Sequence, residues 1–404
     1  MKYKINKSNC FVYFILSLGL FAPIIQTVLR NVDISFLIFI DKIPIAIMSI
    51  YLFLKIIVAR KIAKEFFLLL AFLGYGVLLI FLNDLPIEHV AQVILDSRFF
   101  VYGLFFLYVN KNGSFSKNEL LSFFELIILL SVPICIIQIV FPDFYYSFFG
   151  VLHQDRGVWG INLSSFFSSR VSFAQFLVVF LIFYVCEKMD SKQKFLYLSL
   201  ATFMLILTFS RKEVFFAFFF FPLICVFFYN KIKVFYKSLI LIMSFIAILF
   251  LYTYTIQHSI NELGEDYVRY QIFNYGLDII QDYFPLGSGP GTFGSIFSMS
   301  YLDIYKEYNV PDRIIYGYSD FGRGPIFDMF LSSFIAEYGA GIVFFIIFFK
   351  RCFTLDSRDR KLFSGILIFF LFYSSIMTPA FSTITCLFVM ASLFSLSTAR
   401  DYNV

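Results

Sequence analysis

The chain is a succession of hydrophobic runs, most of them long enough to cross a bilayer as a helix. A transmembrane helix needs about 20 mainly apolar residues, and runs near that length occur at 10–29, 36–54, 65–82, 91–109, 120–141, 171–186, 195–210, 213–229, 238–256, 327–349, 362–378 and 381–397. Asp41, Lys42 and Pro44 interrupt the second run, so its helix is expected to start nearer Ile43. The pattern predicts an all-α polytopic membrane protein with about 12 transmembrane helices.

Composition supports this class. Of the 404 residues 60% are hydrophobic and 15% are charged. A soluble domain could not bury so much apolar surface, whereas lipid can solvate it. The basic residues are scattered over short loops, which argues against nucleic-acid binding. The six cysteines have no metal-ligand spacing, so neither a metal site nor a structural disulfide is predicted.

The distribution of Lys and Arg predicts the orientation. With a cytoplasmic N-terminus, 21 of the 32 basic residues fall in the short inner segments, which are 1–9, 55–64, 110–119, 187–194, 230–237, 350–361 and 398–404. Cytoplasmic loops are enriched in these residues, so both termini are predicted to be cytoplasmic. The first run continues to Leu29 without a cleavage site and is interpreted as an uncleaved span. We expect one transmembrane domain over 1–404, with outer loops at 142–170 and 257–326.

Arginine is concentrated away from the inner segments. These segments hold 16 Lys and 5 Arg, whereas the outer side and the spans hold 3 Lys and 8 Arg. The planar guanidinium matches phosphate oxygens in a bidentate way. Positive charge is disfavoured on the outer side of the membrane. Arginines on that side therefore indicate an anionic ligand there. The alternative is a set of unrelated surface and ion-pair residues.

The only long polar segment lies at about 257–325. It holds nine carboxylates, four basic residues and nine tyrosines. Its middle, 283–294, reads YFPLGSGPGTFG, a glycine-dense turn that neither a helix nor a strand interior favours. Tyrosines and carboxylates are the residue types that bind sugars, and tyrosines also form interfacial aromatic belts.

Three arginines from separate segments are candidate ligands for a pyrophosphate. Arg211 follows Thr208-Phe209-Ser210 between two spans, Arg170 starts the sixth run, and Arg269 lies early in the long loop. Their spacing in sequence does not show whether they converge. Lys212 and Glu213, next to Arg211, are expected to snorkel to the headgroups at a tight turn.

Acidic residues occur where the long loop meets the next span. Asp328 and Glu337 lie at the outer start of an apolar run, a costly position that is usually functional or paired. Asp328 could instead be a helix-start charge that complements the dipole. Arg323 lies just before them in Phe321-Gly322-Arg323-Gly324. Asp96 and Arg98 interrupt the fourth run and are expected to form an internal ion pair or to line a cavity.

The order of these motifs resembles that of the bacterial O-antigen polymerase and O-antigen ligase superfamily. The shared features are about 12 spans, Thr-x-Ser-Arg ending at Arg211, and a large outer loop with an early arginine and the turn Leu286-Gly287-Ser288-Gly289-Pro290-Gly291-Thr292-Phe293. A span opening with Asp328-x-x-Leu331 and Glu337-x-Gly339 follows. These motifs cover the C-terminal half, and hydropathy alone covers the N-terminal half.

The resemblance implies a GT-C-like membrane glycosyltransferase in the bacterial inner membrane. Such enzymes transfer a glycan from undecaprenyl pyrophosphate at the periplasmic face, with inversion and without a metal ion or cofactor. Arg170, Arg211 and Arg269 correspond to the arginines that hold the pyrophosphate, and Arg323 is a further candidate. Expected partners are lipid-linked glycans, membrane lipid and a chain-length regulator protein.

One departure from the family favours a polymerase over a ligase. Ligases carry a His-Asn pair near the end of the loop, where this chain has Phe327-Asp328. Asp328 or Glu337 then becomes the candidate for orienting or deprotonating the acceptor hydroxyl. The remaining alternatives are a ligase that transfers polymer to lipid A-core and a lipid-linked oligosaccharide flippase or other transporter.

Overall fold

The computed structural model describes thirteen parts of the chain. They are residues 7–30, 42–59, 64–110, 117–149, 162–167, 169–186, 192–228, 268–295, 297–316, 325–352, 358–376, 378 and 380–396. Every regular element within these ranges is helical, and none of them contains a strand. The predicted all-α class is confirmed for these residues.

The predicted hydrophobic runs coincide with helices wherever the structure describes them. The N-terminal half contains α1 (Lys7–Arg30), α2 (Ile43–Ala59), α3 (Lys64–Leu82), α4 (Val90–Asp96), α5 (Arg98–Asn110), α6 (Lys117–Val140) and the short α7 (Pro142–Phe149). The next described helices are α8 (Arg170–Cys186), α9 (Lys192–Leu207), α10 (Arg211–Phe215) and α11 (Phe221–Phe228). The expected start of the second helix at Ile43 is confirmed, and the run 238–256 lies outside the described residues.

The C-terminal half contains the polar segment and the last helices. Its elements are α14 (Val268–Tyr283), α15 (Asp303–Glu307), α16 (Asp312–Ile315), the 3-10 turn η8 (Pro325–Asp328), α17 (Phe330–Tyr338), α18 (Ile342–Cys352), α19 (Arg358–Ser375) and α20 (Ile384–Leu396). The polar segment is therefore not a simple loop, because three helices form within it. Its glycine-dense middle is irregular, as predicted.

Several of the apolar helices are short or broken. By length and composition, three of the described helices could cross a membrane (Lys64–Leu82, Lys117–Val140 and Phe330–Cys352), or four if α4 and α5, bent by 43° at Ser97, form one span. A π-helical turn, η4 (Phe216–Phe220), separates α10 from α11. The 3-10 turn η9 (Gly339–Gly341) separates α17 from α18. The predicted polytopic membrane nature thus agrees with the helices, although many of them are irregular.

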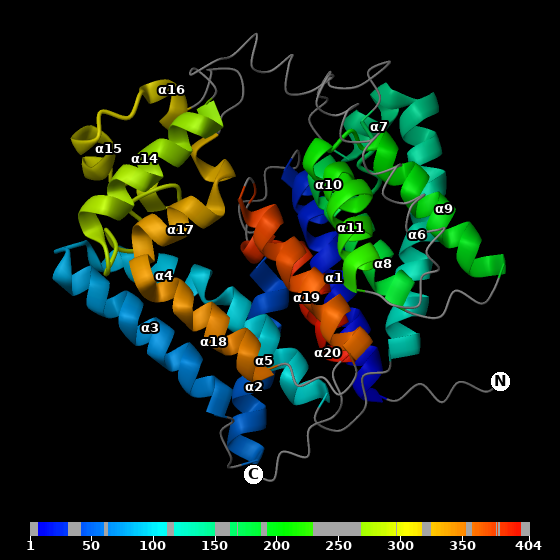
Figure 1. Cartoon of the computed structure of the whole chain (residues 1–404), viewed down its shortest axis with the longest axis horizontal. Coiled ribbons are helices and arrows are strands. Elements are labelled where there is room, and N and C mark those ends of the chain that lie inside the picture. Colours follow the sequence, from blue (N-terminus) through cyan, green and yellow to red (C-terminus); the bar gives the residue numbers. More distant parts are fainter. Residues whose placement is uncertain are drawn as a thin grey trace.

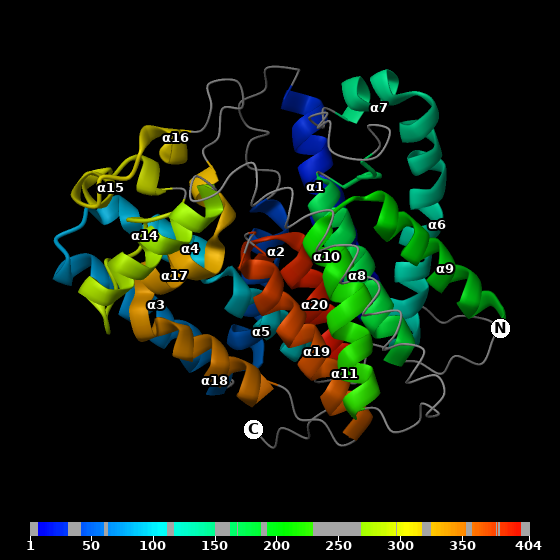
Figure 2. The ribbon, with the colours of Figure 1, turned by 45° about the horizontal axis from the view of Figure 1, so that its top comes forward.

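Two groups of helices flank a central set. Figures 1 and 2 show α3, α4 and α14 to α18 on one side and α6 to α11 on the other, with α5, α19 and α20 between them. Helix α5 is buried from Phe99 to Asn110 and packs on α20, where the Asn110 amide donates to the Phe394 carbonyl over 2.8 Å. A single large apolar core, rich in phenylalanine, runs through both groups.

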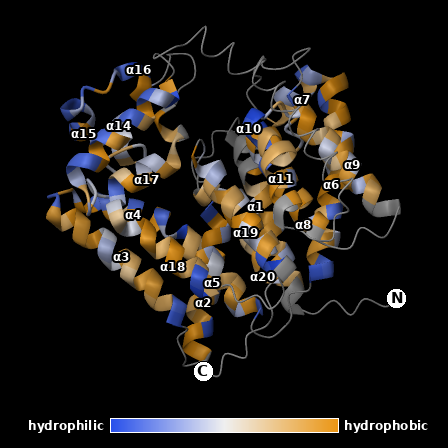
Figure 3. Ribbon diagram, viewed as in Figure 1, coloured by the Kyte–Doolittle hydropathy of each residue, from blue (hydrophilic) through white to orange (hydrophobic). Residues whose placement is uncertain are grey.

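The polar segment has a small core of its own. Ile272 and Ile279 of α14, Tyr305 of α15 and Ile314 of α16 pack with residues of η8 and α17, including Ile326 and Ala336. Figure 3 shows that α15 and α16 contain hydrophilic residues, in contrast to the mainly hydrophobic α3 and α18. The segment therefore packs around a small core that η8 and α17 complete.

Candidate functional site

The glycine-dense turn is fastened to the end of α17 through backbone hydrogen bonds. The Ser288 N–H donates to the Ala336 carbonyl and the Gly289 N–H donates to the Glu337 carbonyl, both over 2.9 Å. The Ala340 N–H donates to the Pro285 carbonyl over 2.8 Å. The backbone amides of the turn are thus engaged in hydrogen bonds to α17, so few of them remain to bind a phosphate.

Glycine is required at two points of this contact. Gly287 and Gly339 both have positive φ, at 93° and 52°. A Cβ on Gly287 would lie 2.4 Å from the Glu337 carbonyl oxygen, and one on Gly339 would lie 2.2 Å from the Pro285 carbonyl oxygen. The close approach of the two segments therefore depends on the absence of a side chain at both positions.

Glu337 is buried beneath the turn. Only 2% of the residue is exposed, and its carboxylate accepts a hydrogen bond from the Phe293 N–H over 2.9 Å. A second carboxylate, that of Asp96 at the end of α4, is near enough to repel it. Such a group is expensive in a membrane protein and marks a functional or a structurally essential site. To act as a base, Glu337 would need the turn to open.

Asp96 is held by side chains from two helices. It accepts hydrogen bonds from the Tyr338 hydroxyl over 2.7 Å and from the Gln92 amide over 2.9 Å. Tyr338 is fully buried and adjoins Glu337 in sequence. Asp96, Glu337 and Tyr338 together form the acidic cluster, in which α4, α17 and the glycine-dense turn meet.

Polar side chains from α3, η2 and α15 also hold the turn. The Tyr75 hydroxyl lies 2.8 Å from the Leu286 carbonyl oxygen and 2.9 Å from that of Tyr338. The buried His89 of η2 (Ile87–His89) places Nδ1 2.6 Å from the Pro290 carbonyl oxygen, so this nitrogen carries the proton. Tyr305 accepts from the Gly294 N–H over 2.8 Å, and burial raises the pKa of its phenol.

Arg170 and Arg211 start two helices that contact each other. The segment before α8 lies against the end of α9, where the Leu163 N–H donates to the Leu207 carbonyl over 3.1 Å. Arg170 is half-buried and donates to the Asn162 side chain over 3.2 Å. Arg211 is exposed at the start of α10. The structure thus brings two of the predicted arginines to neighbouring helix starts.

Lys212 and Glu213 point inward, so the expectation that they snorkel is wrong. The Lys212 ammonium donates to the Ser374 carbonyl and to the Thr378 hydroxyl, each over 2.9 Å, and its side chain is 15% exposed. It lies 3.4 Å from the Glu213 carboxylate, which is fully buried. Partners at the end of α19 draw the ammonium inward and replace its hydration.

Further polar groups complete this arrangement, which we call the Lys212 network. The Gln175 amide of α8 donates to the Glu213 carboxylate over 3.3 Å and to Thr378 over 3.0 Å. The Thr385 hydroxyl of α20 donates to the Gln175 carbonyl over 2.5 Å, and the Ser210 hydroxyl donates to Glu213 over 2.6 Å. The network ties α8, α10, α19 and α20 together beneath Arg211.

The other predicted site residues lie in a different group of helices or outside the residues that the structure describes. Arg269 is half-buried in the first turn of α14, which packs on α17 and η8 rather than on α8 or α10. Arg323 lies outside the described residues, and only the backbone of Asp328 is described, at the end of η8. The structure therefore places Arg269 with the acidic cluster's group of helices, apart from Arg170 and Arg211.

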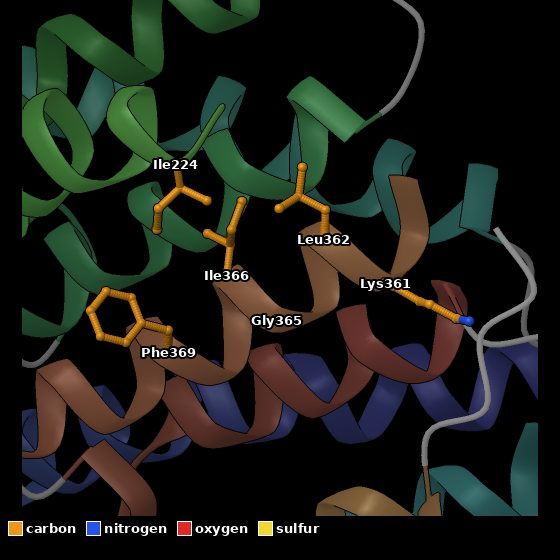
Figure 4. Close-up of a pocket in the computed structure, with 6 residues that line it drawn as sticks. All are labelled: Ile224, Lys361, Leu362, Gly365, Ile366 and Phe369. Atoms are coloured by element: carbon orange, nitrogen blue, oxygen red, sulfur yellow. The ribbon is translucent and has the colours of Figure 1, made fainter. Parts of the chain in front are cut away.

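A pocket between α11 and α19 is apolar. Figure 4 shows its lining, which consists of Ile224, Lys361, Leu362, Gly365, Ile366 and Phe369. It contains no carboxylate and none of the predicted site residues. Lys361 belongs to a segment predicted to be cytoplasmic, so the pocket is not a candidate for the predicted outer site.

Sequence reasoning missed Gln175, Gln92 and His89. Gln175 carried a usable signal, since it is an amide within the apolar run Phe173–Phe183 and such residues in spans are usually functional. Gln92 and Asp96 are four residues apart, which places them on one face of α4. Nothing in the sequence pairs His89 with the glycine-dense turn, because 201 residues separate it from Pro290.

No protein-family model matches the chain, and no curated protein sequence matches it significantly. No group of three or more residues able to hold a metal ion occurs within the described ranges.

Proposed function

We propose that the chain is a membrane glycosyltransferase that polymerises undecaprenyl-pyrophosphate-linked oligosaccharide repeats into a surface polysaccharide. In this proposal it crosses the bacterial inner membrane about 12 times with a GT-C-like architecture, and both termini are cytoplasmic. The observation that carries the proposal is the pair of arginines, Arg170 and Arg211, which start two contacting helices at a face predicted to be periplasmic.

The arginines have a defined role in this reaction. Departure of the pyrophosphate develops negative charge, which fixed guanidinium groups stabilise without having to reorganise. Arg211 is exposed and can meet a ligand, while the Lys212 network beneath it holds the start of α10 in place. Arg170 supplies a second cation from α8. Arg269 and Arg323 would join them only if the group of helices around α14 faces the same space.

The acceptor hydroxyl needs a group that orients it or takes its proton. Asp328 and Glu337 are the proposed carboxylates, at the two ends of the segment from η8 to α17. Glu337 is closed off by the glycine-dense turn, so its participation requires this turn to lift. Asp328 lies in the 3-10 turn before α17.

A lipid-linked oligosaccharide transporter is the second candidate, and the broken helices favour it. Transporters bind their cargo between discontinuous spans, with charged residues near the breaks. Here α4 and α5 are bent at Ser97, next to the half-buried Asp96, and α17 ends at Tyr338, next to the buried Glu337. These features also suit a glycosyltransferase whose glycine-dense turn moves during the reaction.

Deleting the gene and comparing surface polysaccharide on a gel distinguishes these functions. If the protein is a polymerase, the ladder of polysaccharide lengths disappears from the gel while a single repeat unit remains attached to the surface anchor. Loss of all attachment, with long polymer accumulating on the lipid carrier, would indicate a ligase. Accumulation of single repeat units at the cytoplasmic face would indicate a transporter. An unchanged ladder would contradict all three functions.

A further inference from the structure

Helix α14 carries an exposed apolar stripe that the glycosyl-transfer proposal does not use. Tyr270, Phe273 and Leu277 are 53%, 40% and 39% exposed, and Phe284, one residue past the end of the helix, is 64% exposed. Their spacing of three, four and seven residues places them on one side of a helix. Large apolar side chains gathered on one exposed face indicate contact with another apolar phase or molecule.

The helix presents three different faces. Ile272, Gly276 and Ile279 face inward and are buried, two of them in the small core of the polar segment. Asp278 and Asp282 are exposed on a third side of the helix, away from both the apolar stripe and the buried face. A helix that lies along a membrane surface is expected to have such a division, with one face packed on protein, one apolar face and one acidic face.

The stripe continues into a surface predicted to face lipid. The Leu286 carbonyl, just beyond α14, accepts from Tyr75 of α3, and Leu286 itself is 43% exposed. At the same end of α3, Phe81 and Leu82 are exposed. Helix α3 is long and apolar enough to span a membrane, so the hydrogen bond from Tyr75 places the end of α14 against a predicted span.

We infer that α14 is an interfacial helix whose stripe, from Tyr270 to Phe284, is inserted at the boundary between lipid headgroups and acyl chains. Interfacial helices bury their apolar face by roughly 5–10 Å, and a tyrosine at the edge of the stripe suits the headgroup level. Asp278 and Asp282 then point to water. The bilayer thereby holds the small core of the polar segment, and the acidic cluster beneath it, at a fixed height.

The single tryptophan of the chain, Trp159, makes a clean test. In full-length Trp159→Phe protein, Phe273→Trp and Leu277→Trp each place one fluorophore on the stripe, and Asp278→Trp on the same helix is the matched control. Asp303→Trp on α15 is a water-exposed reference. Each protein is reconstituted in nanodiscs of phosphatidylethanolamine and phosphatidylglycerol, with or without bromine near the headgroup end of the acyl chains.

We expect brominated lipid to quench the two stripe positions by about half or more, as insertion to that depth implies, and Asp278→Trp and Asp303→Trp by about a tenth or less. Equal quenching at 273, 277 and 278, or none at 273 and 277, overturns the inference. A blue-shifted emission without quenching at 273 and 277 overturns it too, because the stripe would then be covered by protein. All four substitutions are at exposed positions, so the fold is expected to tolerate them.

Discussion

The acidic cluster and the Lys212 network both bury charge in an apolar helical protein, yet they are built differently. Around Glu337 the partners are largely backbone amides of a glycine-dense turn, so the site depends on two segments lying very close together. In the Lys212 network most partners are side chains, which come from α8, α10, α20 and Thr378 just past the end of α19. The contact around Glu337 can therefore open as a unit, whereas the Lys212 network holds its helices together as a fixed support.

This difference separates residues that hold the fold from residues that can meet a substrate. In the acidic cluster Glu337 is buried, Asp96 is half-buried, and both carboxylates accept hydrogen bonds. Beside the Lys212 network one cation, Arg211, remains exposed. A fully buried charged side chain serves to stabilise or regulate the fold. An exposed charged side chain that a fixed network holds in place is preorganised to bind a ligand.

The largest effect is expected from Gly339→Ala, which disrupts the backbone contact between α17 and the glycine-dense turn. The new Cβ would lie 2.2 Å from the Pro285 oxygen at a positive φ, so α17 and the turn must separate. We expect a loss of about 4 kcal/mol or more in the free energy of unfolding, measured by thermal unfolding in detergent. Gly74→Ala in α3 is the control, because its Cβ meets nothing within 4 Å and should change stability by about 1 kcal/mol or less. Equal stability of the two variants would mean that the close contact is not maintained.

Arg211→Ala and Arg211→Lys probe the exposed cation. Both should slow polymerisation about 100- to 1,000-fold, the cost of losing a fixed donor to the leaving group, with unchanged protein level. The readout is the polysaccharide ladder formed from lipid-linked repeats. Arg313→Ala, an exposed arginine bonded to Gln271, is the control and should leave the ladder intact. A full ladder with Arg211→Ala would remove this residue from the mechanism.

Lys212→Met tests whether the network is a brace. It leaves the buried Glu213 uncompensated, and we expect a loss of about 3 kcal/mol in stability, near the lower end for a buried pair because Lys212 is partly exposed. The double variant with Glu213→Gln should lose less than the sum of the two single variants. Lys306→Met, which breaks an exposed pair of 3.6 Å with Asp303, should cost less than about 1 kcal/mol. Additive losses in the double variant would show that Lys212 and Glu213 are not coupled.

Tyr338→Phe gives the smallest of these effects. It removes the buried hydroxyl that donates to Asp96 and should cost about 2 kcal/mol, since a half-buried carboxylate loses a partner. The midpoint of thermal unfolding reports this loss. Tyr308→Phe removes a comparable bond to Asp282 at an exposed position and should cost less. The opposite ranking of the two variants would mean that the hydrogen bond from Tyr338 to Asp96 is not maintained.

The helices were predictable because run length and apolar content are local properties. Ile43 was identified as the start of α2 from Asp41, Lys42 and Pro44 alone. The breaks were not predictable, since Ser97 is an ordinary helix residue and Gly339 requires a positive φ only because Pro285 passes beside it. The break at Gly339 lies against a neighbour that is distant in sequence.

The site was predictable only in part, for the same reason. Thr208-Phe209-Ser210-Arg211 identified the right turn, but the direction of Lys212 depends on Ser374 and Thr378, more than 160 residues away. Glu337 was singled out because a carboxylate in an apolar run is costly. That the Phe293 amide satisfies it follows from a long-range contact that composition does not encode.

The small core of the polar segment has a consequence for how the protein is made. Ile272, Ile279 and Tyr305 leave the ribosome well before Ile326 and Ala336, which complete the same core. If this segment is exported as proposed, its apolar residues cross to the far side of the membrane before α17 exists to cover them. Maturation of the segment must therefore wait for the following helix to be inserted, and the nascent chain passes through a stage that depends on translocation and on protection from aggregation.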